Sequence, residues 1–441
     1  MVDLLEAKFA SNEAVIGVVG LGYVGLPLVL AYSDKGFRTI GFDVDEFKVG
    51  ALSAGRSYIE HIPSAAISKH VKTGILEATT DFSRVKEVDA LLICVPTPLG
   101  EHFEPDLSYV IRTMEAIVPH LRPGQVLSLE STTYPGTTAE EVVPRVEERG
   151  FEVGKELFVV YSPEREDPGN PEFAGVNIPK VVGGTTEMCL NAGMLLYGAA
   201  FKATVPVRST QIAEFTKLLE NIYRAVNIGL VNELKIAADR MGIDIWEVIA
   251  AASTKPFGFK AFYPGPGLGG HCIPIDPFYL TWKAREYGVH TRFIELAGEI
   301  NRQMPRYVVQ KVMQALNGQR KAVNGAQILI LGLSYKENVD DLRESPTFAL
   351  MDELKAMGAE VSYHDPHIPE IGPTREHMNW CGLKSVPLTE SLKDACDCVI
   401  IATAHKEVDY GNLANWASLI VDTRNAMAKA GVIDNPKVVK A

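Results

Sequence analysis

The sequence predicts an α/β protein with two doubly wound parallel-sheet domains, joined by a central helical domain with a long connecting helix. Short apolar, β-branched runs alternate with helical stretches at both ends of the chain, as in parallel sheets covered by helices. Between them, apolar residues recur at helical spacing. At 441 residues the chain is long enough for two or three domains. We expect domains at 1–208, 209–317 and 318–441.

Composition narrows the class of protein. Hydrophobic residues make up 46% of the chain and charged residues 22%, which is typical of soluble globular proteins. The net charge of −12 argues against a nucleic-acid or anionic-membrane surface, but leaves an anionic small molecule possible. No stretch approaches about 18 uncharged apolar residues, so we expect no membrane span. The N-terminus mixes charges and does not resemble a signal peptide.

The cysteines indicate a reducing, cytoplasmic compartment. There are six of them, without the spacing of a disulfide framework. Cys396 and Cys398 form a CxC inside an apolar run, where strand residues are expected. No second cysteine pair and no suitably spaced histidines support zinc, so we predict no metal site.

The chain opens with a strand, a glycine turn, a helix and a second strand. Residues 14–20 are an apolar run, GLGYVG follows at 20–25, and the second strand ends at Asp43. Gly20 makes the tight turn, Gly22 lets a pyrophosphate approach the backbone, and Gly25 lets helix and strand pack closely. Asp43 would accept hydrogen bonds from the adenosine ribose, which favours NAD over its 2′-phosphorylated form. The pattern predicts an NAD-binding Rossmann domain.

Three further strands deliver polar residues to their carboxyl ends, where ligands bind in open α/β sheets. The run 89–98 ends in Pro96 and Thr97, the run 125–133 ends in Ser131 and Thr132, and the run 156–167 leads to Glu164. Hydroxyls at such ends are candidates for cofactor or water contacts. They also commonly cap the next helix, and a loop glutamate is commonly solvated.

A long helix is predicted from Thr210 to Gly242 by apolar residues at helical spacing. Glu214, Lys217 and Asn221 are spaced i, i+3 and i+7 and therefore share one face. That face is either functional or a solvated polar stripe with a Glu–Lys pair. Helical segments at 244–254 and 277–317 are expected to enclose the loop that lies between them.

That loop, YPGPGLGGHCIPIDP at 263–277, brings glycine backbone up to Cys272. Pro274 suits the first turn of a helix, which would place Cys272 near a helix N-terminus, where the thiol pKa falls. Asp276 would then face the same side one turn on. The loop predicts a covalent cysteine site with a carboxylate beside it. The alternative is a buried structural cysteine.

Residues 326–441 repeat the opening topology, with four matched strand ends. The glycine turn is degenerate, because Gly332 is present but Ser334 and charged residues follow. This domain should therefore bind something other than a second dinucleotide. Lys336, Arg343 and Arg424 fall at apparent strand ends, where cations suit phosphate; they could equally be surface cations.

Together, GLGYVGLP, VPTP, EST, SPE, AExxKLLEN, GPGLGGHCxPxD and SYKxxxDDxRES resemble the UDP-glucose/UDP-mannose (nucleotide-sugar) 6-dehydrogenase family over nearly the whole chain. Segments 57–63, 161–171 and 254–288 look most like the bacterial UDP-N-acetyl-D-glucosamine 6-dehydrogenases of surface-polysaccharide pathways. UDP-glucose dehydrogenases usually carry a serine and a phenylalanine where this chain has His271 and Arg165. A second acidic residue of that branch is Pro168 here.

The resemblance implies an NAD-dependent four-electron oxidation of the C6 alcohol of a UDP-N-acetylhexosamine to the uronic acid, with two NAD⁺ reduced per substrate. UDP-N-acetyl-D-glucosamine is the expected substrate. Cys272 would form a thiohemiacetal and then a thioester. Lys217 and Asn221 would stabilise the oxyanion, Asp276 and Thr132 would position water, and Glu164 is the candidate base.

The resemblance also implies two sets of binding residues and an assembly. The cofactor-binding residues are Gly20, Gly22, Tyr23, Val24, Gly25, Asp43, Lys48, Pro96, Thr97, Thr132 and Arg343. The substrate-binding residues are Glu164, Arg165, Lys217, Asn221, Tyr263, Gly265, Gly267 and Lys336. We expect a homodimer through the central domain, or an assembly of dimers.

Three alternatives stay open. The same chemistry could act on UDP-glucose, UDP-N-acetylgalactosamine or UDP-N-acetylmannosamine. A plain hydroxy-acid dehydrogenase would reduce one NAD⁺ per substrate. A nucleotide-sugar or NAD-sensing binding protein is the non-enzyme alternative, and the intact Cys272, Lys217 and Asp276 argue against it.

Overall fold

The computed structural model describes residues 1–59, 62–100, 103–165, 175–270, 273–374, 376–389, 392 and 395–441. Its contacts divide the chain into two compact units. Unit 1 comprises Met1–Glu220 and Phe278–His290, and unit 2 comprises Asn221–Pro277 and Thr291–Ala441. Each unit is described by itself. The division falls within the helices α8 (Thr210–Met241) and α10 (Asp276–Glu286), so the expected boundaries at 208 and 317 stay a prediction.

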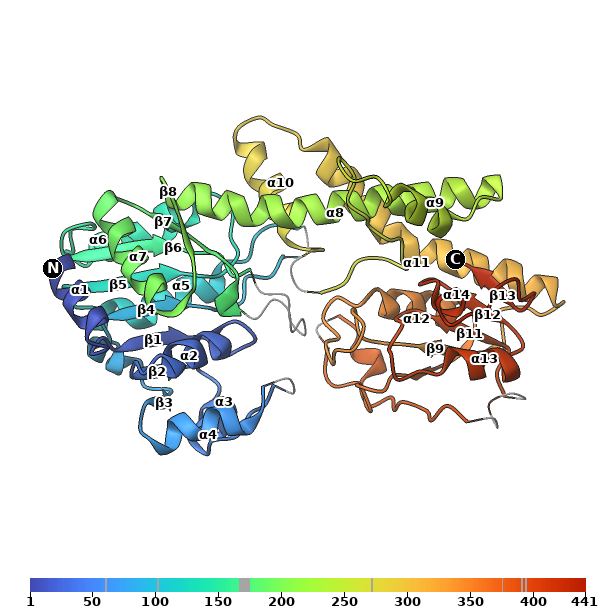
Figure 1. Cartoon of the computed structure of the whole chain (residues 1–441), viewed down its shortest axis with the longest axis horizontal. Helices are drawn as coiled ribbons and strands as arrows, with labels where there is room; N and C mark the ends of the chain where they lie inside the picture. The colour runs from blue at the N-terminus through green and yellow to red at the C-terminus, as the bar shows by residue number, and fades with distance from the viewer. Residues whose placement is uncertain are drawn as a thin grey trace. The chain divides into compact units, whose positions relative to one another are not determined.

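Unit 1 contains an eight-stranded sheet of order β3-β2-β1-β4-β5-β6-β7-β8 (Figure 1). Every neighbouring pair is parallel except β6 and β7, which are antiparallel. The strands are β1 (Ile16–Val19), β2 (Thr39–Phe42), β3 (Leu76–Thr79), β4 (Ala90–Ile93), β5 (Gln125–Leu129), β6 (Leu157–Tyr161), β7 (Lys180–Gly184) and β8 (Thr204–Val207). Strands β1, β2, β4, β5 and β6 were expected, whereas β3, β7 with its reversed direction, and β8 were not predicted.

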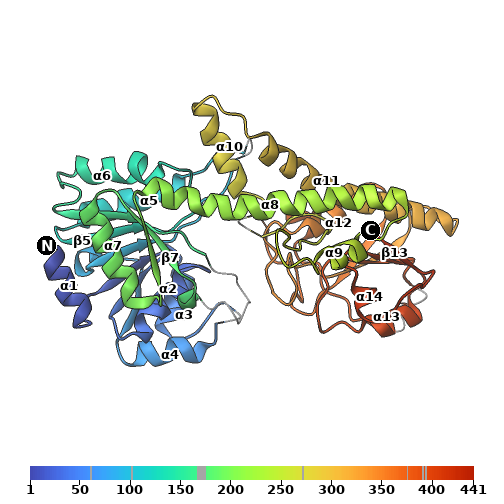
Figure 2. The same ribbon diagram turned by 45° about the horizontal axis from the view of Figure 1, so that its top comes forward.

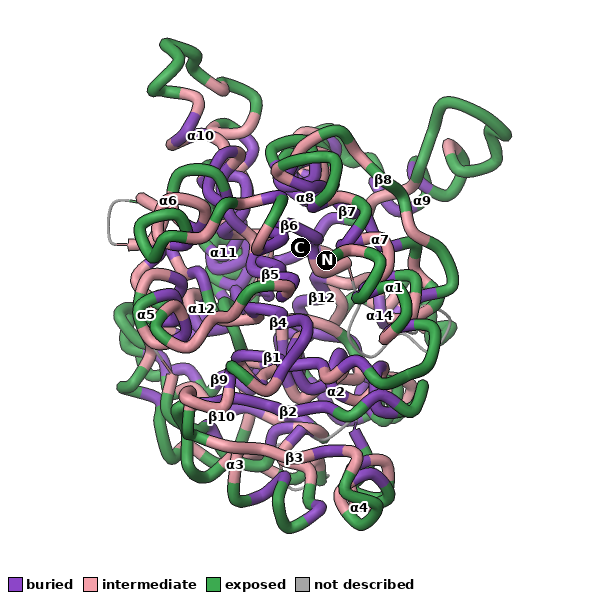
Figure 3. Tube along the Cα trace, turned by 90° about the vertical axis from the view of Figure 1, so that its left-hand side faces the viewer, coloured by how far each residue is buried: buried purple, intermediate pink, exposed green. Residues whose placement is uncertain are grey.

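Two hydrophobic cores cover the two faces of this sheet, as a doubly wound fold requires. On one face lie α1 (Val2–Ala10), α2 (Gly25–Asp34) and α7 (Glu187–Ala200), packed on residues such as Val18 and Leu92. On the other lie α5 (Ser108–Ile117) and α6 (Val143–Glu148), packed on Val19 and Leu91. Both cores use adjacent residues of one strand because side chains alternate across it. Strands β1, β2 and β4 to β7 are buried along their whole length, whereas the edge strands β3 and β8 are partly exposed (Figure 3).

Smaller elements complete unit 1. They are α3 (Glu46–Ser53), α4 (Ser64–Lys72), the 3₁₀ helices at Phe82–Glu87, Val118–His120 and Gly175–Asn177, and a π-helical turn at Thr138–Val142 that leads into α6. Both α3 and α4 contact the edge strand β3.

Unit 2 holds a five-stranded sheet of order β10-β9-β11-β12-β13, in which all neighbouring pairs are parallel. Its strands are β9 (Gln327–Leu331), β10 (Glu360–His364), β11 (Cys398–Ile401), β12 (Ile420–Asp422) and β13 (Val438–Lys440). Its helices besides α8 are α9 (Ile245–Ala252), α11 (Arg292–Gly318), α12 (Pro346–Ala356), α13 (Tyr410–Trp416) and α14 (Ala426–Lys429), with a 3₁₀ turn at Met378–Trp380. Helices α11 and α12 cover one face; α13 and α14 cover the other.

The predicted internal repeat is confirmed down to single hydrogen bonds. The order β2-β1-β4-β5 of unit 1 matches β10-β9-β11-β12 of unit 2. In the first turn the Leu21 amide donates to Asp43 Oδ2 at 2.8 Å, and in the second the Leu333 amide donates to Asp365 Oδ2 at 2.7 Å. Both turns begin with a glycine at positive φ, Gly20 at 90° and Gly332 at 84°. The carboxyl end of the second sheet is therefore built like that of the first.

The helical middle differs in detail from expectation. Helix α8 runs from Thr210 to Met241 and ends at Gly242, whose φ is +71°, so this prediction is confirmed (Figure 2). The stretch 277–317 is two helices rather than one run, because the chain turns at Gly288 with φ +68° between α10 and α11. Pro274 was expected inside a first helical turn but precedes α10, which begins at Asp276.

Candidate active site

The glycine turn of unit 1 has the geometry that a bound pyrophosphate requires. A Cβ on Gly25 would lie 1.8 Å from the Gly20 carbonyl oxygen, and one on Gly20 would lie 2.7 Å from the Cys94 carbonyl oxygen. A Cβ on Gly22 would meet no atom within 4 Å. Gly20 and Gly25 are thus needed for the packing of the turn itself. Gly22 faces open space, which fits the phosphate-facing role expected of it.

Asp43 lies directly beside this turn. Its Oδ2 accepts the Leu21 amide, its Oδ1 accepts the Asp45 amide at 3.0 Å, and Lys48 Nζ lies 3.3 Å from Oδ2. The carboxylate is 6% exposed and retains acceptor capacity on Oδ1. This placement fits an acceptor for ribose hydroxyls, and it brings the expected cofactor residues Asp43 and Lys48 together.

The equivalent carboxylate of unit 2, Asp365, is held by one more donor than Asp43. Asp365 Oδ2 accepts the Leu333 and Ser334 amides and faces His405 Nε2 at 3.1 Å, while Oδ1 accepts the His367 amide. Burial alone would raise the pKa of Asp365, but the hydrogen bond from His405 and the backbone amides outweigh it and lower that pKa. Oδ2 of Asp365 therefore has three donors, whereas Oδ2 of Asp43 has two. That the second domain binds something other than a dinucleotide stays a prediction.

The carboxyl ends of β4 and β5 are tied together. Thr97 Oγ1 donates to the Thr132 carbonyl at 2.7 Å, and Ser131 Oγ donates to the Val95 carbonyl at 2.6 Å. Tyr279 from α10 donates to the Thr97 carbonyl at 2.7 Å and reaches the Pro98 carbonyl at 3.1 Å. The structure therefore brings Pro96, Thr97 and Thr132 to one edge of the sheet, where the hydroxyl of Thr97 links the ends of the two strands.

The polar face of α8 is buried, which excludes the solvated stripe. Glu214, Lys217 and Asn221 are 0%, 5% and 8% exposed. Lys217 Nζ lies 3.6 Å from Glu164 Oε2, so two expected site residues form an ion pair. Glu214 instead accepts the Gly136 amide at 2.6 Å and both the amide and hydroxyl of Thr138. Burial raises the pKa of Glu214.

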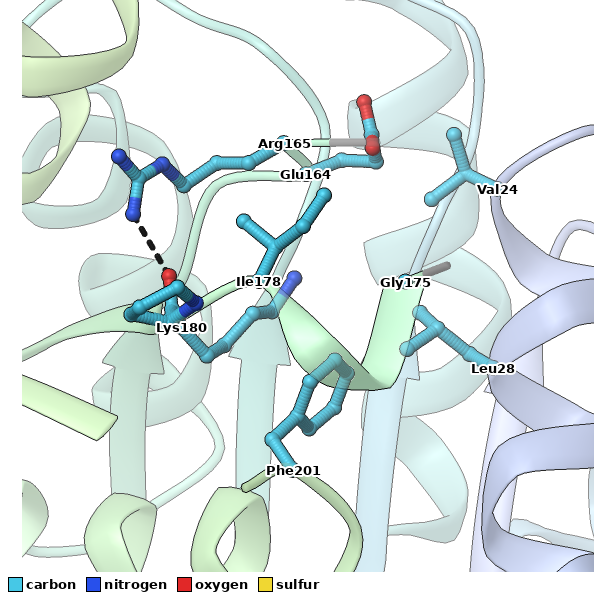
Figure 4. Close-up of a pocket in the computed structure, with 9 residues that line it drawn as sticks. Val24, Leu28, Glu164, Arg165, Gly175, Ile178, Lys180 and Phe201 are labelled. Atoms are coloured by element: carbon cyan, nitrogen blue, oxygen red, sulfur yellow. Dashed lines mark hydrogen bonds between the residues drawn. The ribbon is translucent and has the colours of Figure 1, made fainter. Parts of the chain in front are cut away.

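Glu164 and Arg165 have different surroundings. Both line a small pocket with Leu28 of α2 and with Val24, the residue directly before that helix (Figure 4). Arg165 Nη1 donates to the Pro179 carbonyl at 2.6 Å, and its Nη2 contacts Glu220 Oε1 at 2.6 Å. Arg165 is thus engaged with its own chain, and its expected contact with substrate stays a prediction.

In unit 2, the amide of Asn221 donates to Asp276 Oδ2 at 2.5 Å, and both side chains are buried. These two expected site residues are therefore in direct contact. Cys272, the expected nucleophile, and His271 lie outside the described residues. Asp276 is the first residue of α10, four positions after the cysteine in the chain.

The glycine loop before the cysteine packs on the C-terminal sheet domain. A Cβ on Gly265 would lie 2.5 Å from Arg424 Nη1, and one on Gly269 would lie 2.5 Å from Tyr335 Cβ. The Gly270 amide donates to the Arg343 carbonyl at 2.9 Å. Gly269 and Gly270 are required, because a Cβ on Gly269 would lie 2.9 Å from the Glu344 carbonyl oxygen and Gly270 has a φ of +85°, whereas a side chain on Gly265 would displace the end of Arg424.

The other expected substrate- and cofactor-binding residues of unit 2 are Tyr263, Gly267, Lys336 and Arg343. Gly267 has φ +140°, and Tyr263 stacks on Trp246 with ring centroids 5.7 Å apart. Arg343 forms a fork with Asp341, with Nη2 2.6 Å from Oδ2. Lys336 follows β9 and is half-buried. None of these placements tests a ligand contact.

Of three polar residues in the site region, Arg424 was expected as a strand-end cation, whereas Asn232 and Asn301 were not predicted. Arg424 donates through Nε to the Ala402 carbonyl, and burial lowers the pKa of its guanidinium. Asn232 accepts the Gly265 amide at 3.0 Å and donates to Asn301 at 2.9 Å. For Arg424 the strand-end position was a usable signal. For Asn232 there was none, because an asparagine within a long helix shows no sequence pattern.

Among the described residues, His367, His405 and Glu407 form the one group of possible metal ligands within 4.8 Å of one another. His405 Nδ1 accepts the Asn338 amide at 3.0 Å, so the ring proton is on Nε2, which faces Asp365. A protonated nitrogen has no lone pair for a cation. We assign no metal to this group.

The fold and these sites define a class of protein. A Rossmann sheet with a phosphate-compatible glycine turn and a ribose-compatible carboxylate, followed by a second such sheet whose glycine turn is degenerate, is typical of an NAD-dependent oxidoreductase with a separate domain for its substrate. Among the described residues, no helix is long and apolar enough to cross a membrane.

Sequence comparison identifies the family. The chain matches the UDP-glucose/GDP-mannose dehydrogenase family in its NAD-binding domain at residues 14–201, its central domain at 211–303 and its UDP-binding domain at 329–429. The chain belongs to this family and is an NAD-dependent UDP-sugar dehydrogenase. The family's description names GDP-mannose, whereas we expected UDP-mannose.

Individual relatives agree. Protein CapL of Staphylococcus aureus is 36% identical over 93% of this chain and 95% of its own length. UDP-N-acetyl-D-glucosamine 6-dehydrogenase of Pseudomonas aeruginosa is 36% identical over 89% and 90%. The solved structure of UDP-D-ManNAc dehydrogenase from Pyrococcus horikoshii is 29% identical, with a TM-score of 0.85 over 97% of this chain and 98% of that one.

Proposed function

We propose that this enzyme oxidises the C6 alcohol of a UDP-N-acetylhexosamine, with UDP-N-acetyl-D-glucosamine the first candidate, to the uronic acid. The observation that carries the proposal is the close approach of Gly265 to Arg424, where a Cβ on the glycine would lie 2.5 Å from Nη1. It joins the loop leading to Cys272 to a cation in the region matched by the family's UDP-binding domain. A nucleotide diphosphate bound there would have its sugar beside the cysteine segment.

The proposed reaction is a four-electron oxidation. Bound NAD⁺ supplies the hydride acceptor, once for the alcohol and once more for the thiohemiacetal. Between these events the Cys272 thiolate adds to the C6 aldehyde, forming the C–S bond of the thiohemiacetal, and the second oxidation leaves a thioester. Water then replaces the sulfur, giving the carboxylate and the free thiol. An ordinary alcohol oxidation would not need the cysteine.

The chain's own residues have distinct roles in this proposal. Lys217 and Asn221 stabilise negative charge on the C6 oxygen. Asp276 and Thr132 hold the attacking water, and Glu164 takes its proton. The proposed base Glu164 and the proposed oxyanion partner Lys217 form an ion pair, with 3.6 Å between Oε2 and Nζ.

Product stoichiometry and the cysteine test the mechanism. We expect close to two NADH per uronate formed, whereas a hydroxy-acid dehydrogenase would give one. Cys272→Ala should abolish uronate formation and leave NAD binding intact. Undiminished uronate formation in Cys272→Ala would refute the covalent mechanism, and absence of any oxidation by the unmodified enzyme would favour a binding protein.

The sugar is tested separately. The relatives include one named for UDP-N-acetyl-D-glucosamine and one named for UDP-D-ManNAc, so the panel must contain both, together with UDP-glucose and UDP-N-acetylgalactosamine. Mass spectrometry of the product from an equimolar mixture shows which sugar is preferred. Activity confined to UDP-glucose would exclude an N-acetylhexosamine substrate. The product would serve surface-polysaccharide synthesis.

We also propose a homodimer formed through α8. This helix carries a row of exposed apolar side chains at helical spacing: Ile212, Phe215, Leu219, Tyr223, Leu230 and Leu234. Such a row on a soluble chain marks a protein contact, and a second copy would bury it against itself. Light scattering should give a dimer mass, and Leu219→Glu with Leu230→Glu should give monomers. An unchanged mass would contradict this assignment.

A cytoplasmic location is the remaining part of the proposal. It is supported by the five described cysteines, which are all free thiols.

A further inference from the structure

A buried lysine joins the two chain segments that lead to Thr132 and Glu164. Lys180 is the first residue of β7, the strand that runs antiparallel to β6. Its Nζ donates to Glu130 Oε2 at 2.5 Å and to the Pro163 carbonyl at 3.0 Å. Glu130 precedes Thr132 by two residues, and Pro163 directly precedes Glu164. One ammonium thus fixes both segments.

The ion pair is almost completely removed from water. The side chains of Lys180 and Glu130 are 6% and 0% exposed. Tyr197 donates from its hydroxyl to the other oxygen of Glu130 and lies within 2.6 Å of Ser128. Lys180 Nζ also lies 5.4 Å from the ring centroid of Phe201. Burial raises the pKa of Glu130, and the Lys180 charge acts in the opposite direction.

Such a pair is not explained by stability alone. Burying two charges costs several kcal/mol of solvation, and a well-packed apolar pair of similar volume is often as stable. The ion pair instead orients the Lys180 side chain, because its ammonium has to reach both the Glu130 carboxylate and the Pro163 carbonyl. Figure 4 shows Lys180 and Glu164 on the same pocket, with Phe201 below the lysine.

We propose that Lys180 is a positioning residue for thioester hydrolysis, holding the Glu164 and Thr132 segments at the spacing that the attacking water requires. The inference rests on the proposed function. In the step concerned, a proton passes from water to Glu164, the hydroxide oxygen bonds to the thioester carbon, and the C–S bond breaks to release the Cys272 thiolate and the uronic acid, whose proton then passes to the thiolate to leave the uronate and the free thiol. A shift of either segment slows this step and leaves the two preceding oxidations less affected.

The test measures the thioester directly. Lys180→Met keeps the length of the side chain and removes its donors, and Lys180→Arg keeps the charge. With the most active UDP-sugar, we expect Lys180→Met to release about two NADH per site in a burst and then turn over at least about tenfold more slowly. Intact-protein mass spectrometry after an acid quench should show the uronyl adduct on Cys272. Lys180→Arg should recover much of the turnover.

Two further variants separate positioning from folding. Lys180→Met combined with Glu130→Gln removes both charges, so it should regain thermal stability and still accumulate the adduct. Lys155→Met removes an exposed lysine paired with Glu152 and should behave as the unmodified enzyme. If Lys180→Met does not fold, the same measurements are made on the double variant and on Tyr197→Phe. The latter removes the hydrogen bond from Tyr197 to Glu130.

The outcomes are distinguishable. Glu164→Gln should accumulate the adduct if the proposed hydrolysis is right. If Glu164→Gln accumulates the adduct and Lys180→Met does not, the role of Lys180 alone is overturned. The same follows if Lys180→Met lowers the burst rate and the steady-state rate in proportion. No adduct in Glu164→Gln would overturn the hydrolytic role of Glu164 and this inference with it.

Discussion

Asn221 donates a 2.5 Å hydrogen bond to Asp276, and the two side chains are buried 55 positions apart in the chain. One belongs to α8 and the other opens α10, directly after the cysteine loop. This hydrogen bond lowers the free-energy cost of burying the amide and the carboxylate. The pair therefore fixes the end of the loop on which the proposed chemistry depends.

Exchanging the two residues separates packing from chemistry. Asn221→Asp places two buried carboxylates in contact and should lower the free energy of unfolding by about 2–4 kcal/mol at pH 7. Asp276→Asn should be nearly as stable as the unmodified enzyme but lose about 100-fold or more in uronate formation, since it lacks the carboxylate. The double exchange restores the pair and stability, not activity. Full activity in Asp276→Asn would contradict the proposed role.

Alanine substitutions at two glycines of the first turn should change different properties, stability in one case and NAD affinity in the other. Gly25→Ala forces a Cβ against the Gly20 carbonyl oxygen and should destabilise unit 1 by about 1–3 kcal/mol. Gly22→Ala meets no neighbour, so its melting temperature should be unchanged while its affinity for NAD falls about tenfold or more. Calorimetric unfolding and NAD titration give the two readouts. Normal NAD affinity in Gly22→Ala would show that the pyrophosphate lies elsewhere.

Cofactor choice depends on Asp43. Asp43→Asn weakens the acceptor for the ribose and removes the charge that repels a 2′-phosphate, so we expect the KM for NAD⁺ to rise about tenfold and the KM for NADP⁺ to fall. Asp45→Asn is the matched control, because Asp45 caps α3 through the Phe47 amide. The idea fails if both variants change the NAD⁺/NADP⁺ ratio equally.

Asn232 should affect substrate binding without touching the cofactor turn. It accepts the Gly265 amide and is held by Asn301, which donates to the Ala225 carbonyl. In Asn232→Ala the loop amide is left unpaired, and we expect the KM for the UDP-sugar to rise about tenfold with the Kd for NAD unchanged. Asn227→Ala, which removes only a contact within α8, is the control. Equal effects of the two variants would exclude the loop contact as the cause.

Asp89 makes the stability of unit 1 depend on pH. It contacts Lys8 and Arg122 at 2.7 Å and accepts the Val15 amide. Burial alone would raise the pKa of Asp89, but these hydrogen bonds outweigh it and hold that pKa below 3.8. A lowered folded-state pKa contributes stability above the ordinary value, and this stability is lost as the pH falls through the folded-state value.

Asp89→Asn should therefore reduce the free energy of unfolding by about 1–3 kcal/mol at pH 7 and progressively less below pH ~4. Urea denaturation at several pH values measures the difference. Asp3→Asn, which changes an exposed carboxylate, should show no comparable difference. A constant effect of Asp89→Asn from pH 7 to 3 would contradict the assignment.

Local spacing explains what could be predicted from the sequence. The turn at Gly20, Gly22 and Gly25 and the acidic strand end at Asp43 depend on residues close in the chain, so the sequence specifies their geometry. The second sheet was predictable because its strand ends repeat the first, and even the bond to Asp365 follows that repeat. The shared face of Lys217 and Asn221 follows from helical periodicity alone.

Contacts between segments far apart in the chain could not be predicted, because local spacing does not encode them. The reversal at β7, which brings Lys180 to Glu130, depends on how chain segments 50 positions apart pack, and no local pattern encodes it. Burial of Glu214 on Thr138 rather than pairing with Lys217 was likewise decided by packing. Sequence alone therefore determined the fold class, the NAD turn and the candidate residues. Tertiary structure decided which of them meet, because burial and hydrogen bonding between distant segments depend on the folded core.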